Sequence, residues 1–399
     1  MKISNLRLVK ENDTCKIIAD ISCTFSKEKQ LWFSVKTENC DMLTTDVYDA
    51  FLVAALYPCM YYNEDLIIEG KVSKKLYKNT PYIQAIIKDF RPSLHKVNIQ
   101  VSECTYAQKS SKLHVGTGFS GGVDSFATLM DRFINENDKE WKIDTLFFFN
   151  VGQNGNYNNP KTQERVINRY NLSKCYPDAV GLPFIMMDTN LFAFYLPHWE
   201  FDAGVMCRAT AILVFEKCLQ RYYISSADSY GEMMDYGNAR ITLAAFSDPY
   251  IFPLLSPDGL DIVLDGAQYI RSQKVQLIAE DKLVGQYLNV CVNSNDEHTS
   301  GKNCSICSKC MRTLFTLEIL GKLNNFSSVF NLTLYKEKAF KFKCEQVLLF
   351  GKDTYATENI KLAKELHFPL PSYFTSILVI YPSKIKRKII RVAKKIIKK

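Results

Sequence analysis

The feature that most constrains the fold is a short glycine-rich turn between two apolar runs, Thr117-Gly-Phe-Ser-Gly-Gly-Val-Asp-Ser125. The run before the turn predicts a strand, and the run from Phe126 to Phe133 predicts a helix. This order leaves unpaired backbone N–H groups at the N-terminus of the helix, where the donors and the helix dipole both favour an anion. The segment therefore predicts a site for phosphate or pyrophosphate.

The residue types in the turn suit such a site. Gly121 and Gly122 let the backbone approach an anion without a Cβ atom in the way, and Ser120 and Ser125 add hydroxyl donors. Asp124 would repel phosphate unless a cation intervenes or its carboxylate orients the loop, so we expect Mg²⁺ nearby. The spacing matches neither a Walker A loop nor a dinucleotide fingerprint. The plainer alternative is an ordinary glycine turn.

Strand and helix patterns alternate over residues 111–325. Strands are expected at 113–119, 143–151, 183–188 and 221–226, with helices between them at 125–135, 160–171 and 205–220. This alternation predicts an α/β fold with a doubly wound parallel sheet, and ligands outside the carboxyl ends of its strands. Residues 249–259 are interpreted as an irregular loop and residues 269–288 as helical. The flanking segments predict a small N-terminal α+β domain and a helical C-terminal extension, residues 1–110 and 326–399.

Two polar residues follow strands at the expected binding edge. Gln153 comes directly after the second strand and offers both donors and an acceptor. Arg208 lies in the first turn of a helix, where it opposes the dipole unless a phosphate or carboxylate compensates. Both could instead be ordinary surface residues. Cys207 is either a nucleophile of low pKa at the helix start or, as we favour, a buried small residue.

The cysteines form the second specific pattern. Cys304, Cys307 and Cys310 have the spacing C-x₂-C-x₂-C, and Cys291 precedes them. Four thiolates satisfy a tetrahedral, structural Zn²⁺, while an iron–sulfur cluster is the alternative that the same ligands allow. The length of the chain and this local clustering favour reduced thiols over a disulfide framework among its 13 cysteines.

Positive charge is concentrated at the end of the chain. Residues 384–399 carry nine of the 50 Lys and Arg residues, so the rest is close to neutral although the whole chain has a net charge of +8. Ile385, Ile389, Val392 and Ile396 recur at helical spacing among the lysines. A basic amphipathic segment predicts peripheral contact with an anionic membrane or with nucleic acid, and a solvated terminus is the alternative. No apolar run is long enough to span a membrane, and we expect a cytoplasmic protein.

Taken in order, these motifs resemble a known family. Ser-Gly-Gly-Val-Asp-Ser at 120–125, Val-Gly-Gln at 151–153, Cys-Arg at 207–208 and the four cysteines at 291–310 are similar to the pattern of the 7-cyano-7-deazaguanine synthases. These enzymes belong to the PP-loop superfamily, the N-type ATP pyrophosphatases. The resemblance covers residues 111–325, about half of the chain.

The resemblance implies an ATP-dependent, AMP-forming synthase or ligase that adenylates a carboxylate or amide oxygen before a nitrogen nucleophile displaces AMP. It places ATP phosphates at Ser120, Gly121, Gly122, Asp124 and Ser125, with Mg²⁺, and structural Zn²⁺ at the four cysteines. Gln153 would lie by the nucleotide or substrate, and Asp124, Ser125 and Arg208 would be catalytic.

The sequence departs from the family at Val151, where tyrosine is usual, and at Ala209, where asparagine is usual. The acceptor is therefore left unassigned. Two alternatives remain. One is a PP-loop sulfur transferase that modifies tRNA, in which Cys207 would carry sulfur and the basic tail would contact the RNA. The other is a scaffold that binds a nucleotide without turnover.

Overall fold

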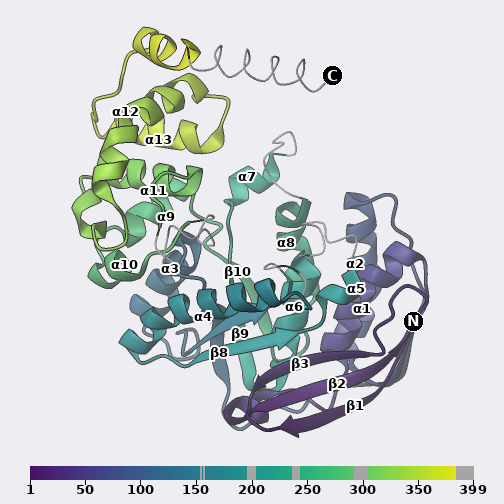
Figure 1. Cartoon of the computed structure of the whole chain (residues 1–399). Helices are drawn as coiled ribbons and strands as arrows, with labels where there is room; N and C mark the ends of the chain where they lie inside the picture. Colours follow the sequence, from purple (N-terminus) through teal and green to yellow (C-terminus); the bar gives the residue numbers. More distant parts are fainter. Residues whose placement is uncertain (153–154, 156–157, 196–203, 236–242, 292–302, 383–399) are drawn as a thin grey trace. The chain divides into compact units, whose positions relative to one another are not determined.

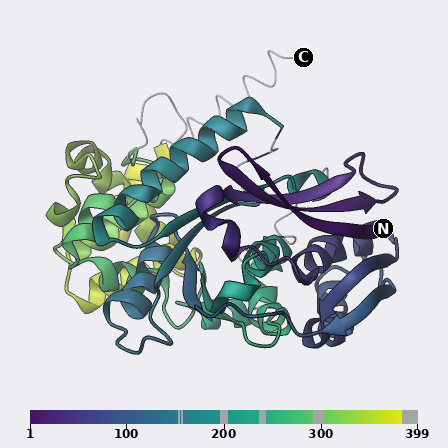
Figure 2. The same ribbon diagram turned by 90° about the horizontal axis from the view of Figure 1, so that it is seen from below.

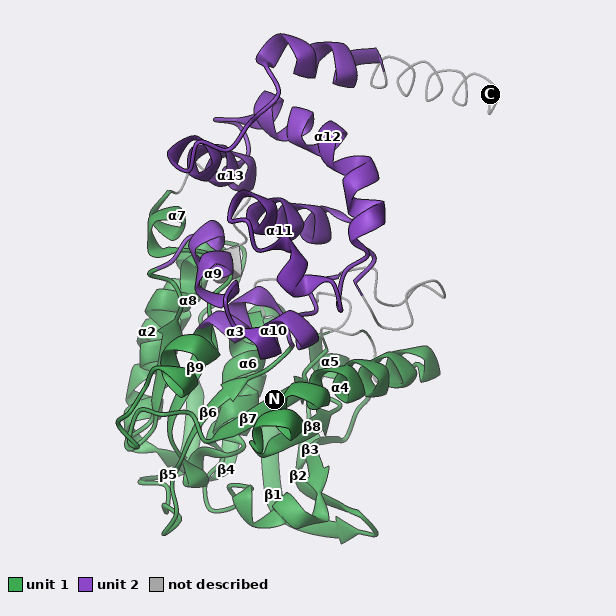
Figure 3. Ribbon diagram, turned by 90° about the vertical axis from the view of Figure 1, so that its left-hand side faces the viewer, with its two compact units in different colours: residues 1–120, 128–268 green, residues 121–127, 269–399 purple. Residues whose placement is uncertain are grey.

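A sheet of ten strands organises residues 1–120 and 128–268 of the computed structural model (Figure 1). The structure describes residues 1–152, 155, 158–195, 204–235, 243–291 and 303–382. Residues 121–127 and 269–399 make up a second compact unit (Figure 3). Each unit is described by itself.

Five neighbouring strands of the first unit are parallel. In sheet order they are β10 (Asp261–Asp265), β9 (Leu219–Ser225), β6 (His114–Gly118), β7 (Thr145–Asn150) and β8 (Phe184–Thr189). Four of the five lie where the alternating pattern predicts strands, and β10 was not predicted. β7 and β8 are added on one side of β6, and β9 and β10 are added on its other side. The strand order therefore switches sides between β6 and β9, while the strands remain parallel. The predicted α/β class with a mostly parallel sheet is confirmed.

The N-terminal residues continue the same sheet. Their strands are β1 (Lys2–Glu11), β2 (Thr14–Ser22), β3 (Gln30–Lys36), β4 (Leu66–Ser73) and β5 (Ile99–Thr105). β1, β2 and β3 are antiparallel neighbours, and β3 joins the parallel strands through an antiparallel pairing with β8, with Phe33 opposite Thr189. Residues 1–110 therefore share one sheet with the strands that follow, and the two compact units divide the chain differently from the three predicted segments.

The helices of the first unit form two groups. α1 (Asp49–Tyr62), α2 (Lys74–Phe90), α6 (Gly204–Leu213) and α8 (Leu243–Leu254) pack against one another, and α4 (Pro160–Val180) contacts β7 and β8. Figure 2 shows α4 above the parallel strands and the other four below them. Phe33, Phe51, Phe147, Phe215 and Phe252 are all fully buried in one hydrophobic core, which spans the N-terminal and parallel parts.

Two expectations about this unit are corrected. Residues 249–254, interpreted as loop from their prolines, belong to α8, where Pro249 and Pro253 lie inside the helix. Burial of Ile251 and Phe252 outweighs the poor helix propensity of proline. Reduced thiols were expected in place of a disulfide framework, and eleven cysteines are free. Cys15 and Cys40 nevertheless form a disulfide, because β2 and the 3-10 helix η1 (Thr37–Met42) bring their Cα atoms to 5.5 Å.

The second unit is helical. Its helices are α9 (Arg271–Ile278), α10 (Lys282–Tyr287), α11 (Ser308–Ile319), α12 (Leu332–Leu349) and α13 (Thr354–Glu365), followed by a helix at residues 373–382. α11 packs against α9, α12 and α13. The start of α3 (Val123–Leu129) also belongs to this unit. Among the described residues, no helix is both long enough and apolar enough to cross a bilayer.

Candidate functional site

The glycine-rich turn has the predicted position between a strand and a helix. β6 ends at Gly118, and α3 begins at Val123. Gly121 has a φ of +71°, a left-handed conformation that glycine adopts without strain. Its carbonyl accepts a hydrogen bond of 2.7 Å from the backbone N–H of Asn289. Ser125 Oγ donates to the carbonyl of Gly122 at 3.0 Å, so this serine helps to shape the first turn of α3.

Two cations from α9 bind the carboxylate of the turn. Asp124 Oδ2 lies 3.0 Å from an Nη of Arg271, and Oδ1 lies 3.3 Å from Nζ of Lys274. The Arg271 and Lys274 side chains are only 12% and 1% exposed. Burial alone would lower the pKa of Arg271, but Asp124 and then Tyr355 outweigh that effect and the net pKa is raised. Both oxygens of Asp124 therefore serve to hold the loop against α9.

α11 brings two more cations to the same region. Lys309 and Arg312 lie three residues apart, on adjacent turns of α11, just as Arg271 and Lys274 do on α9. Burial lowers the pKa of Lys309, and the nearby guanidinium groups of Arg312 and Arg271 lower it further. The Arg312 guanidinium stacks on the ring of Tyr355, 3.7 Å from its centroid.

Cations outnumber carboxylates around the loop among the described residues. Four cations, Arg271, Lys274, Lys309 and Arg312, lie near the carboxylate of Asp124. Two of them, Arg271 and Arg312, line a small pocket between α9, α11 and α13 together with the carboxylate of Glu358. Glu358 accepts a hydrogen bond from the backbone of Ser272 at 3.0 Å. Thiolates of the cysteine cluster would compensate part of this positive charge near Lys309, and an anion beside the loop would compensate more of it. Sequence reasoning missed Arg271 and Lys274, although their spacing on a helix was a usable signal.

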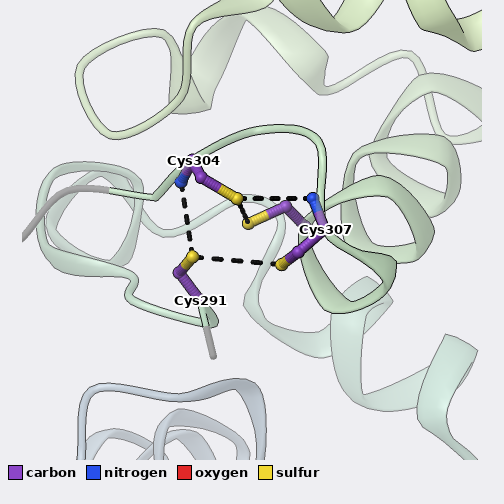
Figure 4. Close-up of side chains that lie close together, drawn as sticks. Cys291, Cys304 and Cys307 are labelled. Atoms are coloured by element: carbon purple, nitrogen blue, oxygen red, sulfur yellow. Dashed lines mark hydrogen bonds between the residues drawn. The ribbon is translucent and has the colours of Figure 1, made fainter. Parts of the chain in front are cut away.

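The four cysteines meet as predicted. The sulfur atoms of Cys291, Cys304, Cys307 and Cys310 all lie within 4.8 Å of one another. The sulfur atoms of Cys291 and Cys307 are 3.9 Å apart (Figure 4). Those of Cys304 and Cys310 are also 3.9 Å apart. The backbone N–H of Cys304 donates to Cys291 Sγ, and that of Cys307 donates to Cys304 Sγ. Such N–H donors stabilise thiolates, so the cluster could hold a metal ion such as zinc.

The cysteine cluster and the loop are connected through Asn289. Its backbone N–H binds the carbonyl of Gly121, and its Oδ1 accepts from the backbone N–H of Cys291 at 3.2 Å. Cys307 is the residue that precedes α11, the helix that carries Lys309. The metal ligands therefore lie within two residues of groups that contact or face the loop.

The other predicted site residues belong to the first unit or lie outside the described part. Arg208 Nη2 contacts both oxygens of buried Asp248 at 2.8 Å, and its guanidinium stacks on Phe252. Arg208 therefore already has an internal carboxylate partner within the first unit. Cys207 is fully buried, and burial raises its pKa, as the favoured structural interpretation requires. Gln153 and the basic tail, residues 384–399, lie outside the described residues.

One further polar pair occupies the carboxyl ends of the parallel strands. Asn150 at the end of β7 donates a hydrogen bond of 2.7 Å to Asp188 on β8, and burial raises the pKa of Asp188. Neither residue was predicted from the sequence to belong to a site. The sequence does contain a pattern that could have indicated them, because a polar residue stands at or next to the end of each of these two apolar strands.

Comparisons with known proteins add no family to these observations. No protein-family model matches the chain, and no curated protein matches it with significance.

Proposed function

We propose that the chain is an AMP-forming, ATP-dependent synthase or ligase of the PP-loop type, with the phosphates of ATP at residues 120–125. The observation that carries the proposal is the cluster of four cations around the carboxylate of this glycine-rich loop. Cleavage between the α- and β-phosphates leaves pyrophosphate, whose charge grows as the bond breaks. Fixed cations and backbone N–H groups stabilise such a developing charge most when they are already in place.

The residues have distinct roles in this proposal. The N–H groups at the start of α3 and the hydroxyl group of Ser120 bind phosphate oxygens. Ser125 would turn its single O–H donor from the Gly122 carbonyl to a phosphate oxygen when ATP binds. Lys309 and Arg312 supply charge for the leaving pyrophosphate. Asp124 orients the loop through Arg271 and Lys274, and Mg²⁺ bound with ATP neutralises further phosphate charge. The acceptor supplies the oxygen that attacks the α-phosphorus, and a nitrogen nucleophile then displaces AMP.

We assign Zn²⁺ to the four cysteines, with a structural role. A tetrahedral ion with Zn–S bonds of about 2.3 Å separates its sulfur ligands by about 3.8 Å, and two of the S–S distances are 3.9 Å. Several irons between the same thiolates would hold the sulfur atoms further apart. The set is closed, since four protein ligands leave no position for a substrate.

The burial of Cys207 counts against the alternative of sulfur transfer. A sulfur carrier must be reached by its donor and its acceptor, and it reacts as a thiolate. Cys207 has no exposed surface, and its pKa is raised by burial. The scaffold alternative makes a different prediction, namely ATP binding without AMP formation.

The test follows ATP labelled in its α-phosphate. The full-length protein is incubated with Mg²⁺ and fractionated cell extract, with small molecules, RNA and proteins kept apart, and labelled AMP is measured. We expect AMP with one fraction, and a loss of about a hundredfold in Lys309→Ala, the size typical of removing one preorganised donor. The matched control is Lys322→Ala, which removes a lysine of the same unit that pairs with Glu280.

Two results would contradict the proposal. One is ATP binding with no AMP from any fraction, which would favour the scaffold. The other is an equal rate in Lys309→Ala and Lys322→Ala, which would remove the cation cluster from the reaction. Circular dichroism of each variant checks that the fold is intact.

A further inference from the structure

α13 packs against the two helices that carry the cations near the loop. It contacts α9 and α11, and all three helices belong to the second unit (Figure 3). Ala356, Ile360 and Ala363 are buried at intervals of four and three positions, so one side of α13 is covered along its length. α13 follows residues 111–325, the segment whose motifs carry the family resemblance. Those motifs therefore give α13 no role.

Tyr355, in the first turn of α13, contacts two arginines of the cation cluster. Its ring stacks on the guanidinium of Arg312, with 3.7 Å between the Arg312 Cζ atom and the ring centroid. Tyr355 also interacts with the guanidinium of Arg271: burial lowers the pKa of Arg271, and Asp124 and then Tyr355 reverse that effect. A planar guanidinium that stacks on a ring loses much of the freedom of its long side chain. Tyr355 is therefore in a position to fix both guanidinium groups.

One turn later, Glu358 and Asn359 hold α13 to the same two helices. Glu358 Oε2 accepts a hydrogen bond of 3.0 Å from the backbone N–H of Ser272, in the first turn of α9, where a carboxylate is favoured. Asn359 Oδ1 accepts one of 2.7 Å from Thr316 Oγ1 on α11. Glu358 and Asn359 are both buried. Hydrogen bonds shielded from water thus fix the height of α13, and with it the place of Tyr355.

The side chains between the three helices are closely packed. Arg271, Arg312, Tyr355 and Glu358 line a space that is too small for a water molecule. A nucleotide cannot enter this space. The residues of α13 therefore act on the arginines and not on a substrate.

We propose that Tyr355 is a positioning residue of the phosphate site: held by α13 against α9 and α11, it fixes Arg271 and Arg312 in place for the binding of pyrophosphate. This inference rests on the proposed function. An arginine that is already ordered binds an anion at a smaller cost in conformational entropy, and it stabilises developing charge without reorganising. The C-terminal segment is then a working part of the ATP site.

The experiment measures binding of inorganic pyrophosphate to the full-length protein by isothermal titration calorimetry. Tyr355→Leu is expected to weaken binding by about tenfold, the size of a desolvated contact between a cation and an aromatic ring. Tyr355→Phe keeps the ring and should stay within about threefold of the natural chain. The matched control is Tyr373→Leu, which removes an exposed tyrosine of the same unit and should leave the affinity unchanged.

Two further readouts separate positioning from a general role in the fold. In an Arg312→Ala background, Tyr355→Leu should change the affinity by less than about twofold, because its effect passes through Arg312. In the AMP assay, Tyr355→Leu should lower kcat about tenfold and change KM for ATP by less than about twofold, since the arginine acts most on the leaving pyrophosphate.

Three results would overturn the inference: equal affinities in Tyr355→Leu and Tyr373→Leu, a loss in Tyr355→Phe as large as that in Tyr355→Leu, or the same loss from Tyr355→Leu with and without Arg312. The proposed reaction fails separately. A natural chain that binds pyrophosphate, loses affinity in Tyr355→Leu and yet forms no AMP would contradict the reaction alone. A natural chain that does not bind pyrophosphate would overturn this inference as well.

Discussion

Replacing Asp124 by asparagine is expected to destabilise the second unit by about 2–3 kcal/mol. Asp124 lies 3.0 Å from Arg271 and 3.3 Å from Lys274, two side chains that are almost completely shielded from water. Removing one partner of a fully buried ion pair costs about 3–5 kcal/mol, because the remaining charge stays buried without compensation. The side chain of Asp124 is 24% exposed, so water replaces part of the lost interaction and the expected cost falls to about 2–3 kcal/mol.

Native-state hydrogen exchange measures this effect in the right part of the chain. The free energy of opening is followed for peptides that cover α9, in the full-length protein. Asp281→Asn is the matched control: Asp281 caps α10 through the N–H groups of Leu283 and Val284. Asparagine caps a helix about as well as aspartate, so the control should change the free energy of opening by less than about 0.5 kcal/mol. Equal effects of the two substitutions on α9 would refute the claim that Asp124 neutralises buried cations.

Three further predictions concern metal content, pH dependence and thiol reactivity. The purified protein should contain about one Zn²⁺ per chain by elemental analysis; Cys307→Ser should lose it and Cys344→Ser, which changes a buried cysteine outside the cluster, should keep it, and equal zinc in both would contradict the assignment. Burial raises the pKa of the Glu216 carboxyl well above its usual value. The folded protein therefore keeps this proton to a higher pH than the unfolded chain does. As a result, the free energy of unfolding falls as pH rises above the unfolded pKa of about 4.3. Glu216→Gln should therefore gain stability relative to the natural chain by about 1 kcal/mol or more between pH 5 and pH 8 in urea unfolding, and a pH-independent difference would disprove this account. Buried Cys207 should react with maleimide far more slowly than exposed Cys104 in peptide mapping; comparable rates would show that Cys207 is accessible.

The parts of this protein that local sequence patterns determine were predictable. The turn at Gly121 follows from the order of strand, glycines and helix, all within about twenty residues. The cysteine cluster was predictable because three of its ligands lie within seven residues, and their spacing permits little else than a metal site. In both cases the residues that define the feature are close together in the chain.

The parts that long-range contacts determine were not predictable. Arg271 and Asp124 are 147 positions apart, and no pattern around either residue names the other. The pairing of β3 with β8 likewise joins Phe33 to Thr189, and it places the N-terminal strands in the same sheet. Local propensity was also misleading at Pro249, where burial of neighbouring apolar residues keeps the helix intact.

The loop at residues 121–127 and the cysteine cluster are far apart in the sequence but belong to one structural unit. Their contacts suggest a physical reason for both to occur in one chain. Asn289 binds Gly121 through its backbone N–H and Cys291 through its side chain. On the other side of the cluster, Cys307 directly precedes α11 and lies five residues before Arg312. A metal that holds the four sulfur atoms in place would also hold two neighbouring segments in place. One is the backbone at Asn289, which contacts the loop, and the other is α11, which carries Lys309 and Arg312. Fixed charges stabilise an anion better than mobile ones, because they need not reorganise when it binds. Under the proposed function, a metal at the four cysteines would therefore help to support the loop that binds phosphate.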